Sequence, residues 1–504
     1  MSLARVKTRC RQGLSAPLVS VEIHLSAGLP TIALVGFSEA TVRDAKERVR
    51  SAILSTGFRW PDSRLTISIS PAALQKTGAG FDLPIAVAIL IASKQLPSSL
   101  ADSAEFFGEL SLDGRVLETK GLLAAIASER DATTLVYTSE VNAEALFAVC
   151  PNLVGLASLK DLKQPDQIKK NRPSTNVPQD RHYAPTTMNL PAGQPELWRV
   201  SEIAAAGSHH LLMSGEPGAG KTMAAELIRQ LLPKPSTKEI LESQILLDIS
   251  NQPYSLERPF RAPHHSVSTA GLVGGTRHAN PGEISLAHNG ILFLDELPEF
   301  SLATIEALRQ PLETGEIQVT RAEQSHVYPA KFQLVAAMNP CPCGFKDSID
   351  NHCRCSTAAL NRYDTKLSEP LLDRIDLYVQ VKRSRVAEIM APTTQQATLR
   401  AQAKTRVDSA RERQITRQGV ENARIPSAQL LDLCALSTTT KSWLETTGER
   451  LRLSGRGLHR CLRVARTIAD LANTESVTSA ELCEALAYRR SPSMQLSNTS
   501  FGAT

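Results

Sequence analysis

A glycine-rich segment, Gly215-Glu-Pro-Gly-Ala-Gly-Lys-Thr222, constrains the fold of this chain more than any other feature. The apolar run Leu211–Met213 comes before it and predicts a buried strand. Met223–Leu232 follows with the pattern of a helix, which Pro233 terminates. A strand, a glycine turn and a helix in this order are typical of a loop that binds phosphate groups at a helix N-terminus.

The residues of this turn carry the chemistry that phosphate binding needs. Gly215, Gly218 and Gly220 lack a Cβ atom, so backbone N–H groups can face phosphate oxygens. Lys221 can then reach the β- and γ-phosphates, and the hydroxyl of Thr222 can bind Mg²⁺. We therefore expect ATP and Mg²⁺ as cofactors, the alternative being a plain glycine turn.

A second segment completes the expected site. Ile291–Leu294 is fully apolar and ends in Asp295 and Glu296, as expected of a buried parallel strand whose C-terminal end faces a ligand. Asp295 is expected to hold Mg²⁺ through water, and Glu296 to orient and deprotonate the attacking water. An acid pair after an apolar run is a weak signal alone, but a strong one downstream of a phosphate loop.

The chain is too long for one core, because 504 residues predict about two to four domains. Residues 1–160 have a mixed α/β pattern, with strands at Thr31–Val35 and Leu65–Ser70 and helices at Ser38–Ser55, Leu83–Ala92 and Leu122–Ser128. Residues 161–188 are rich in Lys, Gln, Asn and Pro and are interpreted as a linker. Residues 189–382 hold the nucleotide motifs, 383–492 have a helical pattern, and 493–504 form a polar tail that we expect to be disordered.

Composition limits the compartment and the partners. No apolar run approaches the ~18–20 residues of a membrane span, and no apolar segment follows the basic residues at the start, so we expect a cytoplasmic protein without membrane contact. Nine cysteines in a chain of this length do not suggest a secreted disulfide scaffold. The net charge of +5 is compatible with a nucleic-acid partner but does not argue for one.

Four of the cysteines form two C-x-C pairs, Cys341-Pro-Cys343 and Cys353-Arg-Cys355. Four thiolates that a short loop brings together suit tetrahedral Zn²⁺, so residues 341–355 are a candidate zinc loop, with His352 as a substitute ligand. The alternative is that these thiols are free or form disulfides.

The sequence around these motifs resembles the YifB/ComM family of magnesium-chelatase-like AAA+ ATPases. The matching stretches, which cover nearly the whole chain, are Gly78–Pro84, Gly108–Gly114, Arg261–Ser266, Pro281–Asn289 with Gly290, Asn339–Gly344, Leu371–Asp376 and Ala465–Asp470. This resemblance implies an α/β chain with an N-terminal ribosomal-S5/Lon-protease-like domain, a central P-loop AAA+ domain with a parallel sheet, and a C-terminal helical lid domain.

The same resemblance implies a function. Members of this family include hexameric, ATP-driven DNA motors. They promote branch migration when incoming single strands recombine with the chromosome in natural transformation. Single-stranded and branched DNA and further copies of the chain are therefore the expected partners. Two alternatives stay open: a chaperone-like ATPase that remodels proteins, and a chelatase-type motor subunit, against which the Lon-like domain argues.

Three further site residues follow from the resemblance. Asn339 is similar to the residue that positions the lytic water, or else lies in a simple turn before Pro340. Arg374 is similar to the arginine finger inserted into a neighbour's site, the alternative being an ion pair with Asp373 or Asp376. Arg460, with Arg456 as second candidate, is similar to the lid arginine that touches the γ-phosphate.

Other candidate features are weaker. A Lon-type peptidase is not expected, because Lys76–Asp82 contains no serine and Lys120 would lack a nucleophile.

Two short strands, Glu316–Arg321 and Ser325–Ala330, predict a hairpin. Arg321 on this hairpin, with Lys331 nearby, could contact DNA phosphates, unless the hairpin only packs between subunits. The basic stretch Arg400–Arg417 is interpreted as a solvated amphipathic helix, the alternative being a contact with DNA. The histidines are expected at a pore or subunit contact rather than at a metal: His264, His265, His278 and His288.

Overall fold

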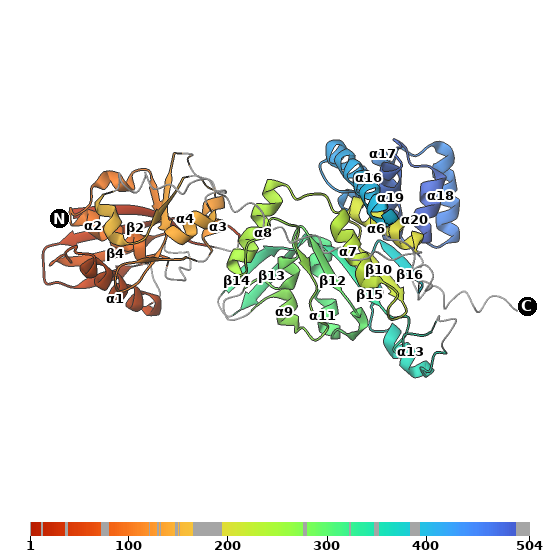
Figure 1. Cartoon of the computed structure of the whole chain (residues 1–504), viewed down its shortest axis with the longest axis horizontal. Helices are drawn as coiled ribbons and strands as arrows, with labels where there is room; N and C mark the ends of the chain where they lie inside the picture. Colours follow the sequence, from red (N-terminus) through yellow and green to blue (C-terminus); the bar gives the residue numbers. More distant parts are fainter. Residues whose placement is uncertain are drawn as a thin grey trace, which may run out of the picture. The chain divides into compact units, whose positions relative to one another are not determined.

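The computed structural model describes residues 2–11, 14–35, 39–71, 80–119, 121–128, 131, 133–146, 150, 152–164, 194–275, 280–321, 324–346, 352–383 and 394–489. They form two compact units (Figure 1). Unit 1 comprises Met1–Pro185 together with Gln244–Tyr254, and unit 2 comprises Thr186–Ser243 and Ser255–Thr504. The predicted 161–188 linker falls mostly outside the described residues, as does the 493–504 tail. The boundaries at 160, 188, 382 and 492 stay predictions.

Unit 1 contains a seven-stranded sheet in the order β3-β4-β2-β1-β5-β8-β9. Along Ser2–Arg9, Leu18–Ser26 and Arg64–Ser70, buried residues alternate with more exposed ones, because one face of the sheet lies on the core. The strands are β1 (Ser2–Arg9), β2 (Leu18–Ser26), β3 (Ile32–Val35), β4 (Arg64–Ser70), β5 (Ala104–Phe106), β8 (Leu135–Ser139) and β9 (Leu153–Leu156), with a small pair of β6 (Glu109–Leu110) and β7 (Val116–Leu117).

The helices of unit 1 confirm the predicted pattern. Helix α2 (Asp82–Ala92) is apolar on all sides and every one of its residues is buried, as expected of a core helix. Its single acid, Asp82, pairs with Arg48 at 2.7 Å. The other helical segments are α1 (Glu39–Ser55), η1 (Ser98–Ala101), α3 (Leu122–Ala127), α4 (Glu140–Leu146) and η2 (Leu159–Lys163).

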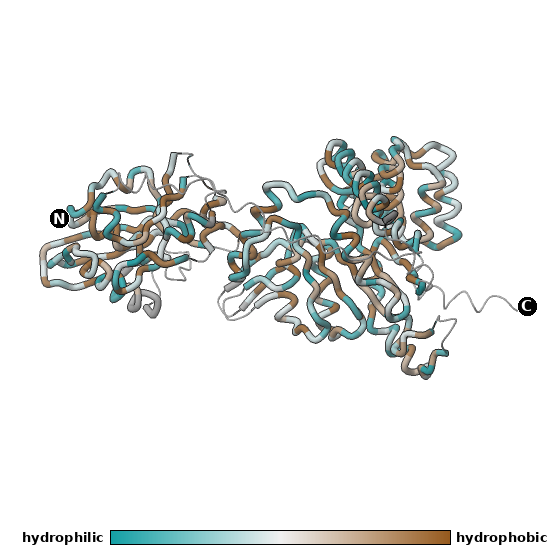
Figure 2. Tube along the Cα trace, viewed as in Figure 1, coloured by the Kyte–Doolittle hydropathy of each residue, from teal (hydrophilic) through white to brown (hydrophobic). Residues whose placement is uncertain are grey.

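Unit 2 is built on a five-stranded sheet in which every pairing is parallel. The order is β11 (Phe260–Arg261), β12 (Ile291–Leu294), β15 (Gln333–Met338), β10 (Leu211–Gly215) and β16 (Leu377–Val381). Hydrophobic residues gather along these strands (Figure 2), as expected of a sheet covered on both faces. Because parallel strands end at one edge, the segments after β10, β12 and β15 meet there.

Helices and a hairpin surround this sheet. The segments between the strands are α6 (Pro195–Gly207), α7 (Lys221–Leu231), α8 (Thr237–Ile249), α9 (Thr269–Val273), α10 (Glu283–Leu286), η3 (Leu297–Glu299), α11 (Leu302–Glu306), α12 (Arg309–Thr314), α13 (Thr357–Asp364) and α14 (Glu369–Leu372). The predicted hairpin is confirmed as β13 (Glu316–Arg321) and β14 (Gln324–Pro329), which pair antiparallel. None of the described helices combines the length and the hydropathy needed to cross a membrane.

The C-terminal part of unit 2 is helical, as predicted. It consists of α16 (Thr394–Gln418), η4 (Asn422–Arg424), α17 (Ser427–Cys434), α18 (Thr438–Arg450), α19 (Gly455–Leu471) and α20 (Ser479–Ala487). Helices α16 and α19 both pack on α6 of the sheet region. The amphipathic α19 begins at Ser454, whose side chain accepts a hydrogen bond from the N–H of Gly457.

The prediction that the basic face of α16 is solvated is wrong. Arg411, for example, donates to the carbonyl of Ala205 at 2.8 Å and to the Ser208 hydroxyl at 2.7 Å, and burial lowers its pKa to about 10. The remaining basic residues also bind groups of unit 2: Arg400, Lys404, Arg406, Arg413 and Arg417. These side chains hold α16 in place, because their partners come from elements distant in sequence.

Candidate nucleotide site

The loop between β10 and α7 has the conformation that its glycines predict. Gly218 and Gly220 lie in the left-handed region, with φ of 77° and 95°. A Cβ atom on Gly215 would lie 2.3 Å from the carbonyl oxygen of Val381 on the adjacent strand. The loop is therefore compact and leads into the N-terminus of α7, where free N–H groups favour an anion.

Lys221 links the loop to the next strand. Its Nζ atom donates to the carbonyl oxygens of Gly215 at 2.6 Å and Glu216 at 3.0 Å, and to Oδ1 of Asn339 at 3.0 Å. Burial lowers the pKa of Lys221, against the opposing charges of Asp295 and Glu296. The ammonium group thus lies between the phosphate loop and Asn339, the residue expected to position water.

The predicted magnesium ligands also lie together. Oγ1 of Thr222 is 3.4 Å from Oδ2 of Asp295, and Oδ1 of Asp295 accepts a hydrogen bond from the backbone N–H of Glu296 at 2.9 Å. A hydroxyl and a carboxylate are hard oxygen donors, so this pair fits Mg²⁺. Glu296 has a φ of 51°, an uncommon value for a residue with a side chain and one that clusters at functional sites.

Two residues that sequence reasoning did not assign to the site contact it. Nδ1 of His265 lies 3.3 Å from Oε2 of Glu296. Only the topology could have indicated His265. It follows β11, which lies beside the parallel strand β12, so the segments after the two strands meet at the same sheet edge. The side-chain amide of Gln194 donates to the carbonyl of Ala219 at 3.0 Å and so supports the phosphate loop.

The other histidines have separate partners. Nε2 of His288 lies 3.1 Å from Oε2 of Glu242, and this contact lowers the pKa of Glu242 to about 2. The ring of His264 is tilted by 35° against that of His265, with ring centroids 4.0 Å apart. Within the described part of the chain, no group of potential metal ligands includes a histidine. His278 lies outside the described residues.

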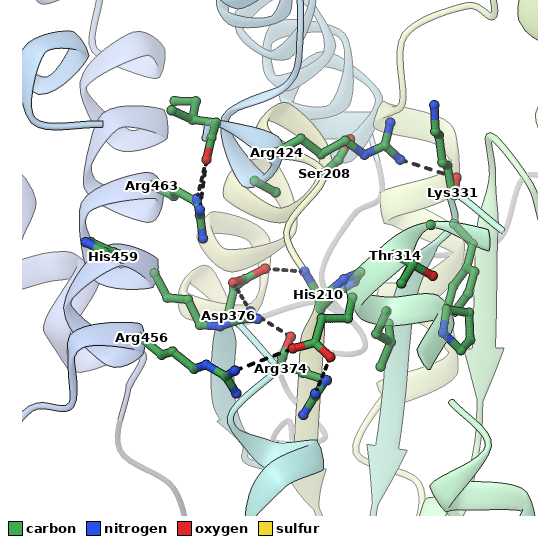
Figure 3. A pocket seen from close by; sticks show the side chains of 18 of the residues that line it. Ser208, His210, Thr314, Lys331, Arg374, Asp376, Arg424, Arg456, His459 and Arg463 are labelled. Atoms are coloured by element: carbon green, nitrogen blue, oxygen red, sulfur yellow. Dashed lines mark hydrogen bonds and ion pairs between the residues drawn. The ribbon is translucent and has the colours of Figure 1, made fainter. Parts of the chain in front are cut away.

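The two predicted arginines meet in a second location, a cavity of about 520 Å³ shown in Figure 3. Arg374 donates to Oε2 of Glu313 at 2.7 Å and to the carbonyl of Pro370 at 2.5 Å. Arg460 donates to the carbonyl of Arg374 at 2.7 Å and to Oδ1 of Asp376 at 2.5 Å. The described residues that line this cavity include none from the phosphate loop or the Asp295–Glu296 pair.

Asp376 organises this cavity. Burial would raise the pKa of its carboxyl, but the charge of Arg460 and the nearby ring of His209, whose Nδ1 atom lies 3.6 Å from Oδ2, hold that pKa well below its usual range. Its Oδ2 atom also accepts the backbone N–H of His210 at 3.0 Å. Burial lowers the pKa of His210 to about 4, so this ring is neutral at physiological pH. Asp376 therefore fixes Arg460 to the start of β16.

The four predicted cysteine ligands converge. Their Sγ atoms lie within 4.8 Å of one another, and Sγ of Cys341 is 3.3 Å from that of Cys343 and 3.7 Å from that of Cys353. A disulfide needs ~2.05 Å, so these are free thiols in the structure. Hydrogen bonding from the Phe345 backbone lowers the pKa of Cys343 to about 6, whereas burial raises that of Cys341 to about 12. Four sulfur donors at this spacing fit Zn²⁺.

The cysteine loop touches the nucleotide site. A Cβ atom on Gly344 would lie 2.8 Å from Cδ of Pro217 in the phosphate loop. Tyr363, on α13 after the loop, donates its hydroxyl to the carbonyl of Asn339 at 3.0 Å. The loop therefore packs behind two parts of the candidate active site.

The structure describes only part of the segment considered for peptidase chemistry. Lys120 and most of Lys76–Asp82 lie outside the described residues. Asp82 is buried, and burial raises its pKa to about 6 against the opposing effect of Arg48. This carboxyl serves the core of unit 1, since it also accepts the backbone N–H of Leu110 at 3.3 Å.

Comparisons with known families match three segments. Residues 188–389 match "Magnesium chelatase, subunit ChlI", residues 21–139 match "Subunit ChlI of Mg-chelatase", and residues 398–489 match "Magnesium chelatase, subunit ChlI C-terminal". The first segment contains both candidate nucleotide-binding motifs, and the third contains Arg460.

Individual relatives match from end to end. The chain is 41% identical over 507 residues to the uncharacterized protein YifB of Escherichia coli, covering 97% of both chains. It is 41% identical over 500 residues to the competence protein ComM of Haemophilus influenzae, covering 97% of this chain and 98% of that protein. It is 39% identical over 508 residues to the uncharacterized protein Rv2897c of Mycobacterium tuberculosis, covering 97% and 99%.

Proposed function

The chain belongs to the YifB/ComM family of magnesium-chelatase-like AAA+ ATPases, and from this premise we propose that it is an ATP-hydrolysing DNA motor. Its substrate would be single-stranded and branched DNA, and its role would be branch migration during the integration of incoming single strands. The observation that carries the proposal is the convergence of Lys221, Thr222, Asp295, Glu296 and Asn339 at one sheet edge. The name of the Haemophilus relative, a competence protein, supports the link to DNA uptake.

Each residue of this site has a distinct task in the proposed hydrolysis. The loop N–H groups and Lys221 bind and orient the phosphates, and Thr222 and Asp295 hold Mg²⁺, which would supply charge neutralisation. Glu296, whose side chain is 51% exposed, can accept the proton of an attacking water. The side-chain amide of Asn339, now hydrogen-bonded to Lys221, can orient the same water.

The cavity that contains Arg374 and Arg460 supports catalysis between subunits. Arg374 and Arg460 lie together in a cavity lined by other residues than those of the phosphate loop. We assign them to the nucleotide of a neighbouring copy, where their charge would stabilise the transferring phosphoryl group. A closed ring, most simply a hexamer, presents such a cavity to every site. The lid arginine expected from the sequence would therefore act in the neighbour's site.

Two further assignments belong to the proposal. The β13–β14 hairpin, with Arg321 at the end of β13 and Lys331 shortly after β14, is the candidate DNA contact. The four-cysteine loop is assigned one structural Zn²⁺ per chain, because its sulfur atoms already form a compact group.

ATPase measurements with and without single-stranded DNA test the function. We expect DNA to stimulate hydrolysis by the purified protein, and three-stranded junctions to be resolved with ATP. Lys221→Ala should lose nucleotide binding, while Glu296→Gln should retain binding and stop turnover. A wild-type ATPase indifferent to DNA would reject the DNA motor and favour protein remodelling or chelatase-type action. Turnover by Lys221→Ala would reject the site itself.

A further inference from the structure

We infer that Glu313 is a positioning residue that gives up its arginine partners to the neighbouring subunit's nucleotide, and thereby transmits the state of that nucleotide to the β13–β14 hairpin. The inference rests on the proposed function, because it needs Arg374 to act between subunits. Glu313 lies in the cavity of Figure 3 and was not a candidate from the sequence.

Glu313 contacts arginines from two different elements. Its Oε2 atom is 2.7 Å from Nη2 of Arg374, in the turn after α14, and its Oε1 atom is 3.6 Å from Nη2 of Arg456 on α19. Figure 3 shows Arg456 and Arg374 directed to the same part of the cavity. One carboxylate therefore bridges the two arginines.

Arg374 is incompletely satisfied by this arrangement. Its side chain is only 9% exposed, and its Nε atom is buried without a hydrogen-bond partner among the described residues. A buried donor without an acceptor is costly, so an additional acceptor at this position would be stabilising. The adjoining cavity of about 520 Å³ leaves room for one.

The cavity carries more positive than negative charge. The cationic side chains that line it are Lys331, Arg374, Arg424, Arg456, Arg460 and Arg463, against Glu313, Asp373 and Asp376. Asp376 is buried with Arg460, whereas the side chain of Glu313 is 52% exposed. Because the carboxylate of Glu313 is half exposed, water screens its pair with the largely buried Arg374, and we expect that pair to contribute about 1 kcal/mol. A polyphosphate, which offers several charged oxygens, can therefore displace Glu313 from the arginines.

Glu313 is joined to the hairpin by a short rigid path. Helix α12 ends at Thr314, Gly315 follows it with a φ of 70°, and β13 begins at Glu316. The carbonyl of Gly315 accepts the N–H of Ala330 at 2.7 Å, which closes the hairpin base. The hydroxyl of Thr314 donates to the carbonyl of Glu316 at 3.0 Å. A movement of Glu313 is therefore transmitted directly to the turn from which the hairpin projects.

The test measures ATPase rates of the assembled full-length protein with and without single-stranded DNA. Glu313→Gln should raise the rate without DNA by up to about fivefold, the factor that corresponds to 1 kcal/mol. DNA should then add little further stimulation of this variant, because the loss of the Glu313 ion pairs has already changed the position of the hairpin turn. Glu369→Gln removes the same charge from an exposed residue at the start of α14, five positions before Arg374, and should behave as wild type.

The outcomes separate the inference from the function on which it rests. If Glu313→Gln shows the wild-type ATPase rate and the wild-type DNA stimulation, or a lower rate, the role of Glu313 is overturned. In that case an inactive Arg374→Ala variant would still support the finger role of Arg374. Normal hydrolysis by Arg374→Ala in the assembled ring would instead reject the finger role. Glu313→Asp, which keeps the charge on a shorter side chain, should restore most of the DNA dependence, and its failure to do so would contradict an ionic mechanism.

Discussion

At the scale of single residues, Asp376 shows how one buried charge can organise a site. It lies at 4% exposure, accepts the N–H of His210, and forms an ion pair with Arg460 at 2.5 Å. A buried pair contributes little net stability when it is intact, but loss of one partner leaves an uncompensated charge. Position 376 therefore requires a carboxylate, because Arg460 would otherwise lose its buried negative partner.

Asp376→Asn should destabilise the protein by about 3–5 kcal/mol, because Arg460 would lose its carboxylate. The pKa of Asp376 is lower in the folded state than the value of about 3.9 in an unfolded chain. Its contribution is therefore present above that value and is lost as the pH falls below it. Urea denaturation between pH 7 and pH 3 should show a weaker acid dependence in the variant.

The control for this prediction is Asp373→Asn, which removes an exposed acid from the same cavity. It should change the free energy of unfolding by less than about 0.5 kcal/mol, as is usual for surface substitutions. Equal losses in the two variants, or an unchanged acid dependence in Asp376→Asn, would contradict the role given to Asp376.

Sequence reasoning found the residues whose signal is local. Lys221 and Thr222 follow their glycines directly, and Asp295 and Glu296 end an apolar run, so each belongs to a short pattern. Glu313 and His265 carry no such pattern. Their partners, Arg374 and Glu296, are distant in sequence and become neighbours only through the fold.

At the scale of elements, the cysteine loop is the clearest example of one segment supporting another. It presents Gly344 to Pro217 of the phosphate loop, and the following helix presents Tyr363 to the carbonyl of Asn339. A metal bound by four thiolates would hold both contacts in register, because structural zinc fixes the loop that binds it.

Zinc removal should therefore impair hydrolysis as well as folding. We expect about one Zn²⁺ per chain by metal analysis, and Cys355→Ser should lower both the zinc content and the turnover number by about tenfold or more. Cys483→Ser, an exposed cysteine on α20 away from the group, is the matched control and should leave both unchanged. A zinc-free protein with four titratable thiols and normal turnover would refute the site.

The elements themselves were largely predictable, because their hydrophobic periods are local. Ile291–Leu294 forms the predicted strand, and Asp82–Ala92 forms the helix predicted at Leu83–Ala92. The basic face of α16 was misjudged for the opposite reason, since a charge pattern does not reveal whether its partners are water or another helix.

At the scale of the whole molecule, the two groups of residues that we assign to ATP hydrolysis lie at separate places in unit 2. Lys221, Glu296 and Asn339 form one place, and Arg374 with Arg460 forms another. A single chain cannot complete the site if the arginines serve a different nucleotide. Copies arranged head to tail would bring each arginine pair to the next phosphate loop, and closure of that arrangement yields a ring.

Mixing inactive variants tests this arrangement. Lys221→Ala destroys a subunit's own site but keeps its Arg374, whereas Arg374→Ala keeps the site but loses the finger. Each variant should be inactive alone. In a random equimolar ring about a quarter of the interfaces combine an intact Lys221 with an intact Arg374, so ATPase activity should return to roughly a quarter of the wild-type rate. Lys221→Ala mixed with Glu296→Gln is the control and should stay inactive, because both changes fall on the same side of the interface. Activity in that control mixture, or none in the first mixture once fluorescence has shown that the subunits exchange, would mean that Arg374 does not act between subunits.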